Sequence, residues 1–242
     1  MRTRPPLILR YILSPAVFDD MKEIFLRNHD LGAGGQANES IWLEKDILTK
    51  LAGTGRLFLF KSNAFWSQIK TASSAIYANR HYLEVYRRSH PEALSRPSED
   101  GPIIVGDVRV HPSADVHPTA KIGPNVSIGP GVRIGPGTRI KDSIIMKSVV
   151  IGAHAVVMNA IVDSAGRIGD WSRVEGAKVG ANPNDPTTSV PELPLFSRDG
   201  ALNANVTIIG EETTVADGVL VLNVICMPHK EIAGDARNEI IL

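Results

Sequence analysis

The stretch VHPSADVHPTAKIGPNVSIGPGVRIGPGTRI, residues 110–140, carries a branched aliphatic residue at every sixth position. A helix repeats near 3.6 residues and a strand near 2.0, so neither has this period. A six-residue unit of one short strand and one turn predicts a parallel β-helix, in which three units make a coil and the aliphatic side chains stack inward. The inward series is Val110, Val116, Ile122, Ile128, Ile134 and Ile140, and a second small or branched series follows four positions later at Ala114, Ala120, Val126, Val132, Thr138 and Ile144.

The series continues with small changes of register. It resumes at Ile145, Ile151 and Val157, and again at Val162, Ile168 and Val174, so a step of five twice replaces a step of six. A turn shortened by one residue explains each change. After a non-repetitive segment, about 176–205, the period returns at Ile209, Val215 and Val221. Residues 110–242 are therefore predicted to form one solenoid with a single inserted loop.

The composition excludes several functional classes. The chain has 242 residues, of which 26 are basic and 26 acidic, so the formal net charge is zero. This balance gives no electrostatic reason to expect a nucleic acid or an anionic membrane as partner. No apolar run approaches the roughly 18 residues that cross a bilayer, because Arg10 splits the run from Leu7 to Leu13. A single cysteine, Cys226, is expected to be a buried thiol in a reducing, cytoplasmic compartment.

The first 95 residues indicate a partial α/β domain, and Pro97 and Pro102 lie in a linker at 96–109. Strands are predicted at Leu7–Leu13 and at Leu57–Phe60, the latter buried on both faces. Three helices are predicted. One has Ser14 as N-cap and Pro15 in its first turn, one ends at Gly53, and one lies just before the linker. Their expected buried faces are Val17, Phe18, Met21, Ile24 and Phe25; Leu43, Ile47, Leu48 and Leu51; and Ile76, Leu83 and Tyr86.

Several segments together resemble a known family. They are Glu44-Lys45-Asp46, FWSQIKTASSAIYANRHYL at 65–83, Asn182-Pro-Asn-Asp-Pro, Leu195-Phe-Ser-Arg-Asp-Gly, and Met227-Pro-His-Lys-Glu. With the solenoid, they are most similar to the mannose-1-phosphate guanylyltransferases, or GDP-mannose pyrophosphorylases, of the alpha-subunit type. The resemblance implies that residues 1–95 are the end of a Rossmann-like nucleotidyltransferase domain. It also implies that the β-helix is left-handed, an exception to the usual crossover rule.

Two departures from the family pattern bear on activity. The family's Gly-rich nucleotide loop, G-G-x-G-T-R-x-R-P, does not occur in residues 1–242. The family motif W-x-D-I-G, whose Asp helps to hold the catalytic Mg²⁺, has Gln68 at the Asp position here. We therefore expect no catalytic residues, metal or cofactor in this chain. The resemblance implies a regulatory subunit in GDP-mannose biosynthesis that acts by assembly with a catalytic beta subunit. A shortened form of an active nucleotidyltransferase is the alternative.

Two groups of residues are candidates for binding. Glu44 and Lys45 match the family motif at the sugar-phosphate side of the pocket, and the alternative is a charged first turn of a helix. The insertion is stiffened by prolines, which reduces the freedom lost on docking and favours binding of a partner; a packed loop is the alternative. In that interpretation the polar contacts come from Asn184 and Asp185, and the apolar anchors are Leu193, Leu195 and Phe196.

A hexapeptide acyltransferase is the rival class, because such enzymes use a catalytic His and form trimers. His111 and His117 are six residues apart, at the same place in successive repeats. They are therefore expected in turns at neighbouring corners, where they cannot hold one metal ion within one chain. Each precedes a proline, which favours turn packing. Either class is expected to form oligomers, with itself or with a partner, because a β-helix exposes strand edges and flat sheet faces.

Overall fold

The computed structural model describes residues 11–30, 40–60, 69, 71–178, 195–198, 200, 202–203 and 205–242. The chain divides into two compact units, Met1–Trp66 and Ser67–Leu242. The helix that the sequence predicts just before the linker therefore belongs to the same unit as the solenoid. No helix within the described residues is long and apolar enough to cross a membrane.

The first unit contains α1 (Val17–Asp30), the π-helical turn η1 (Leu43–Leu48) and α2 (Thr49–Leu51). Its core consists of Val17, Ile24 and Ile47, which confirms part of the predicted helical faces. Gly53 ends the helical segment with a left-handed φ of 78°, as expected of a glycine at a helix C-terminus. The Arg56 guanidinium then binds Asp20 of α1 with two hydrogen bonds of 3.0 and 2.7 Å.

The structure departs from the sequence predictions for this unit at three places. Leu57–Phe60 is not a buried strand, since Phe58 and Phe60 are 86% and 90% exposed. Nor do Tyr11 to Leu13 form a strand, while residues 7–10 lie outside the described part of the chain. A strand needs a neighbouring strand to pair its backbone N–H and C=O groups, and the described residues of this unit form no strand. Finally, α1 begins at Val17, after a turn in which Ser14 O accepts from Val17 N at 3.0 Å. The side chains of Phe18 and Phe25, which the sequence places on the buried face of this helix, are exposed.

The second unit opens with α3 (Ala72–Ser89), which confirms the predicted helix. Thr71 is its N-cap, because the Thr71 hydroxyl accepts from Ser74 N at 3.2 Å. A short 3₁₀ turn, η2 (Pro91–Ala93), follows it. The side chains of Ile76 and Leu83 on α3 are each only 1% exposed.

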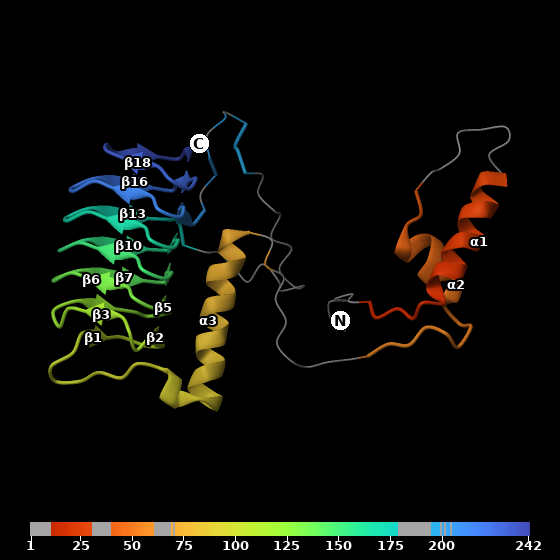
Figure 1. Ribbon diagram of the computed structural model, residues 1–242, viewed down its shortest axis with the longest axis horizontal. Coiled ribbons are helices and arrows are strands. Elements are labelled where there is room, and N and C mark those ends of the chain that lie inside the picture. The colour runs from red at the N-terminus through yellow and green to blue at the C-terminus, as the bar shows by residue number, and fades with distance from the viewer. Residues whose placement is uncertain are drawn as a thin grey trace, which may run out of the picture. The chain divides into compact units, whose positions relative to one another are not determined.

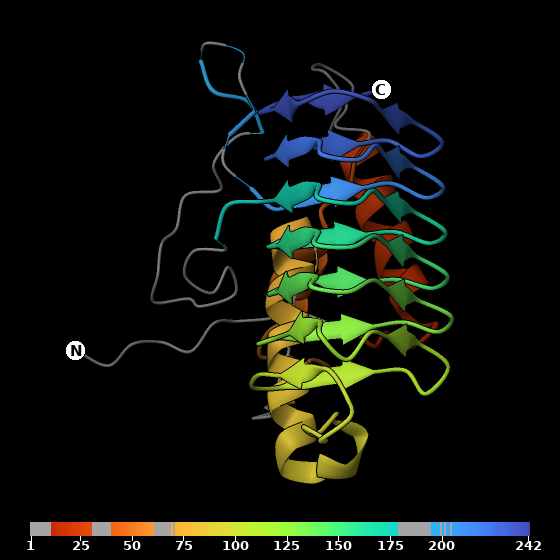
Figure 2. The same ribbon diagram turned by 90° about the vertical axis from the view of Figure 1, so that its left-hand side faces the viewer.

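The rest of this unit is the predicted parallel β-solenoid, about seven coils long (Figures 1 and 2). Each strand pairs in parallel with the strand three places along the chain, which gives three sheets consistent with a left-handed β-helix of hexapeptide repeats. Sheet A holds β1 (Ile103–Ile104), β4 (Lys121–Ile122), β7 (Arg139–Lys141), β10 (Val156–Met158), β13 (Arg173–Glu175), β16 (Leu220–Leu222) and β19 (Ala236–Arg237). Sheet B holds β2 (Val108–Val110), β5 (Val126–Ile128), β8 (Ile144–Ile145), β11 (Ala160–Val162), β14 (Thr207–Ile209), β17 (Ile225–Cys226) and β20 (Ile240–Ile241). Sheet C holds β3 (Asp115–Val116), β6 (Arg133–Ile134), β9 (Val150–Ile151), β12 (Arg167–Ile168), β15 (Thr214–Val215) and β18 (Glu231–Ile232).

The predicted inward series forms the core of this solenoid. From Ile122 to Val221 its members are at most 4% exposed, while Val110 and Val116 in the first coil are half-buried. The second series is buried from Ala120 to Thr138. Its first member, Ala114, is half-buried, as is its last, Ile144, where the preceding Ser143 is buried instead. The turn between β7 and β8 is one residue shorter than in the preceding coils, so the buried position falls at residue 143 and not at 144.

The strand register gives the number of residues in each coil and in the insertion. Lys121 pairs with Arg139, eighteen residues on, and Arg139 pairs with Val156, seventeen residues on. Ala160 pairs with Thr207, forty-seven residues on, which is one seventeen-residue coil with thirty residues inserted. This extra length equals that of the segment 176–205 predicted from the sequence.

Helix α3 packs against sheet B, over β5 and β11 (Figure 2). Asn79 accepts from the Ser127 hydroxyl at 2.5 Å, Arg80 pairs with Asp142 at 3.1 Å, and Arg87 pairs with Asp107 at 3.3 Å. The aliphatic outward positions of this sheet, such as Ile144 and Ile161, are only partly exposed. Sheet B is thus the sheet of the solenoid that carries a helix.

Candidate functional site

Glu44 and Lys45 lie on the exposed first turn of η1. Glu44 accepts a hydrogen bond of 2.9 Å from the Tyr11 hydroxyl. Desolvation of that hydroxyl, with this hydrogen bond and the Glu44 charge, raises the pKa of Tyr11. Lys45 places its Nζ 5.2 Å from the centroid of the Trp42 ring. The two side chains thus contact different neighbours, and the assignment of a sugar phosphate to them stays a prediction.

The insertion is described at its two ends. Asn184, Asp185 and Leu193 lie outside the described residues, as does Gln68 of the family motif. Leu195 and Phe196 are each 46% exposed. Phe196 pairs with Leu202 in an antiparallel bridge, and Leu195 O accepts from Asn203 N at 2.9 Å. Two of the five predicted partner-binding residues thus lie on a small exposed hairpin.

Asn223 holds this hairpin on the solenoid. It is 8% exposed, and its side-chain amide donates to Leu202 O at 3.2 Å and to Asn203 O at 3.3 Å. Its side-chain oxygen accepts from Asn205 N at 2.8 Å. Sequence reasoning missed this residue. The available signal was a recurrence of Asn or Asp at one left-handed corner in five coils, at Asn125, Asp142, Asn159, Asn223 and Asn238.

The histidines take part in turns. His111 Nδ1 lies 2.9 Å from the Ser113 hydroxyl, and His117 Nδ1 lies 3.0 Å from the Thr119 hydroxyl. In each turn the backbone N–H two residues on also donates to the ring nitrogen, at 3.2 Å. Within the described residues, no three metal-binding side chains of the His, Cys, Asp or Glu type gather in one place.

Cys226 is buried, as predicted, with its side chain in the solenoid core. Burial raises the pKa of this thiol, although a hydrogen bond with Thr213 and the charge of Lys230 act in the opposite direction. A raised pKa leaves little thiolate at neutral pH, and the thiolate is the nucleophilic form. This environment fits a structural thiol.

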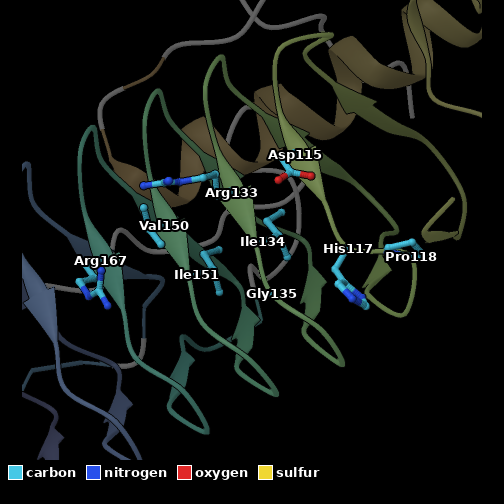
Figure 3. Close-up of a pocket in the computed structure, with 9 residues that line it drawn as sticks. All are labelled: Asp115, His117, Pro118, Arg133, Ile134, Gly135, Val150, Ile151 and Arg167. Carbon is cyan, nitrogen blue, oxygen red and sulfur yellow. The ribbon is translucent and has the colours of Figure 1, made fainter.

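A shallow open pocket of about 520 Å³ lies on sheet C (Figure 3). Arg133 and Arg167 stand two strands apart on β6 and β12, with Val150 of β9 between them. In Figure 3 the Arg133 side chain extends toward Val150, and His117 lies at the opposite end of the pocket. Both arginines are exposed, and neither forms an ion pair with a described residue. Such guanidinium groups above an apolar floor can bind an anionic group. The sequence analysis did not single them out, because each occupies an ordinary outward position.

The comparisons with known proteins agree with the solenoid and with the segment before it. The family model described as the GMPPB C-terminal domain matches residues 104–241. A protein of Xenopus tropicalis named mannose-1-phosphate guanylyltransferase regulatory subunit alpha is 47% identical over 237 residues, 96% of this chain. This chain belongs to the mannose-1-phosphate guanylyltransferase family.

Other members of the mannose-1-phosphate guanylyltransferase family give the same picture. Proteins named regulatory subunit alpha-B in Danio rerio and regulatory subunit alpha in Homo sapiens are 46% and 44% identical, each over 96% of this chain. The chain spans 56% of the length of each of these two relatives. Among solved structures, PerB from Caulobacter crescentus is 18% identical over 66% of this chain and 60% of its own, with a TM-score of 0.30. That similarity is too low to support an argument about function.

Proposed function

We propose that this chain is a regulatory-type subunit of a mannose-1-phosphate guanylyltransferase, which makes GDP-mannose and diphosphate from GTP and mannose-1-phosphate. The observation that carries the proposal is the 44–47% identity, over 96% of the chain, to proteins named regulatory subunit alpha. Because the chain spans 56% of those proteins, its substrates and partners belong to the proposal. The subunit acts in the cytoplasm by assembly with a catalytic beta subunit. Residues 1–95 then correspond to the end of a nucleotidyltransferase domain.

The surface of the solenoid supports assembly. Sheet B carries α3, whereas the outward positions of sheets A and C include the exposed Lys121, Arg139, Arg133 and Arg167. Charged side chains on a flat sheet face give orientation and selectivity to a partner with the opposite charge. The coils also end in strands whose outer backbone groups can pair with another chain.

The insertion supports a partner contact of its own. Asn223 fixes the returning limb, so Leu195 and Phe196 reach the surface from a held position. Ordering them before binding lowers the entropy lost on binding. In this proposal Leu193, Leu195 and Phe196 anchor the partner, and Asn184 and Asp185 add polar contacts. Glu44 and Lys45 form part of a sugar-phosphate surface.

The strand register provides a clean test of the insertion. Removing the thirty residues 177–206 joins Gly176 to Thr207 and leaves a seventeen-residue coil. Gly176 then occupies the left-handed corner, which glycine adopts without strain. Binding to the catalytic beta subunit is measured for the intact and the shortened chain, together with the GDP-mannose output of the complex. Leu195→Ser with Phe196→Ser is the point-variant version, and unfolding temperatures verify that each variant folds.

We expect the intact chain to bind and change the output of the beta subunit, and the shortened chain to lose most of that effect. Equal binding and equal output would show that the insertion is only a packed loop. Failure of the intact chain to bind would overturn the regulatory proposal. The chain alone, supplied with GTP, mannose-1-phosphate and Mg²⁺, is expected to show no turnover, because Gln68 replaces the family's metal-binding Asp.

A further inference from the structure

One corner of the solenoid, between sheets C and A, carries an unusual residue. Successive coils place Gly137, His154, Trp171 and Gly218 at this corner, and all four have left-handed φ values, 67°, 56°, 59° and 71°. Glycine adopts this conformation freely, but for a side chain as bulky as tryptophan it is an outlier. Trp171 is nevertheless 69% exposed, so burial does not compensate for its backbone conformation. Ser148, Ala165 and Glu212 adopt the same conformation at other corners, so the large exposed ring is what distinguishes Trp171.

One face of the Trp171 ring is covered and the other is open. Its ring stacks on His154 with 4.2 Å between centroids and 22° between planes. On the other side the next coil offers only Gly218, and a Cβ built there would meet no atom within 4 Å. His154 fills the same kind of space over Gly137, where a Cβ would fall 2.4 Å from the His154 Nδ1. The corner above Trp171 therefore has room for one more planar group.

Two carboxylates belong to this corner, one on each side of the Trp171 coil. Asp170 Oδ1 accepts from Ala153 N at 2.7 Å, and Asp217 Oδ1 accepts from Asp170 N at 2.7 Å. Each carboxylate thus holds a turn with one oxygen. Asp170 bonds toward the coil of His154, whereas Asp217 belongs to the coil of Gly218, on the open side of the ring. The nearby Arg173 is paired with Glu175 at 2.8 Å. Among the described residues, cations lie over the rings of Trp42 and Tyr86 and none lies over Trp171.

We propose that this corner, formed by Asp170, Trp171 and Asp217, is a docking site for an arginine side chain of the catalytic subunit. A guanidinium is planar and cationic, so it can stack on the open ring face and pair with the Asp217 carboxylate, while Asp170 adds negative charge to the same corner. A nucleotide base could also stack there, but its phosphates would meet two carboxylates. Tryptophan and arginine are also the residues most enriched among those that dominate binding energy at protein interfaces. The identity of the partner rests on the proposed function.

The test separates binding from stability. Trp171→Asn removes the ring and places at the corner a residue that tolerates a left-handed conformation. Trp171→Phe keeps a ring, and Asp217→Asn keeps the acceptor oxygen for Asp170 N while removing the charge. Met146→Ala is the matched control, since Met146 is also an exposed apolar residue at a corner of the solenoid, 42% exposed. Affinity for the catalytic subunit is measured at low and high salt, and the unfolding temperature of each variant is recorded.

We expect Trp171→Asn to weaken binding by about tenfold with an unchanged or higher unfolding temperature, and Trp171→Phe to recover most of the affinity. Asp217→Asn should cost about threefold at low salt and less at high salt. Equal affinities for Trp171→Asn and the wild type would overturn the inference while leaving the regulatory proposal intact.

A second measurement does not depend on the catalytic subunit. The indole N–H signal of Trp171 is followed by NMR while acetyl-Gly-Arg-Gly-amide or its lysine counterpart is added at constant ionic strength. The inference requires a saturable shift with the arginine peptide that is larger than the shift with lysine and is reduced in Asp217→Asn. Without that shift the inference fails, whether or not the chain binds the catalytic subunit.

Discussion

Asn223 lies at the corner between β16 and β17, one coil beyond the corner from which the insertion leaves. Its backbone has a left-handed φ of 52°, and its side chain bonds to the backbone of Leu202, Asn203 and Asn205. Asparagine can do both, because its short polar side chain tolerates that conformation and bonds locally. Asn223 thus adopts the left-handed conformation of the turn and also makes the long-range hydrogen bonds to the insertion.

Replacement of Asn223 separates these two roles. Asn223→Gly keeps the backbone conformation and removes the side-chain hydrogen bonds, so we expect a loss of about 2 kcal/mol in the free energy of unfolding. Asn223→Ala adds the cost of a left-handed alanine, about 1 kcal/mol more. Urea unfolding of both variants measures the two losses. A glycine variant as stable as the wild type would show that the hydrogen bonds add nothing.

At the level of strands, the position of a residue within the repeat decides its contribution. Ile151 on β9 points into the core and is 1% exposed, while its neighbour Val150 points outward and is half-buried. We expect Ile151→Ala to destabilise the chain by about 3 kcal/mol, since it leaves a cavity in a closed stack. Val150→Ala should cost less than about 1 kcal/mol. Denaturant midpoints for the pair decide the matter, and equal losses would contradict the assigned register.

The same logic explains which predictions succeeded. The period of six is a direct consequence of one strand and one turn, so it located the inward residues from Ile122 to Val221. It could not locate the missing residue within a shortened turn, and Ser143 therefore replaced Ile144 inside. At Leu57–Phe60 the apolar run gave a preference for burial but no information about a neighbouring strand. The stacking of Trp171 on His154 could not be predicted from the sequence either, because it depends on which residues adjacent coils bring together.

At the scale of the molecule, the two units differ in the size of their cores. The first unit buries Val17, Ile24 and Ile47, whereas the solenoid buries one continuous stack from Val108 to Ala236. Local stability follows the number of buried apolar contacts. The two units are therefore expected to open independently, with the first unit opening at lower free energy.

Amide hydrogen exchange tests this difference. We expect the amides of α1 to exchange orders of magnitude faster than those of β7, β10 and β13, because three buried side chains protect a helix weakly. The exchange of α3 should follow the solenoid, since Asn79, Arg80 and Arg87 bind it there. Equal protection of α1 and the central strands would contradict the prediction.

Among the described residues, a hydrogen bond of 2.7 Å from Ala177 N to Asn205 O joins the two ends of the insertion. Because its ends already touch, the segment between them can grow or shrink without moving the coils above and below. Doubling the length of such a loop costs only about 0.6 kcal/mol of chain entropy. A different recognition sequence can therefore be inserted at the corner between β13 and β14 while the coils of the solenoid keep their structure.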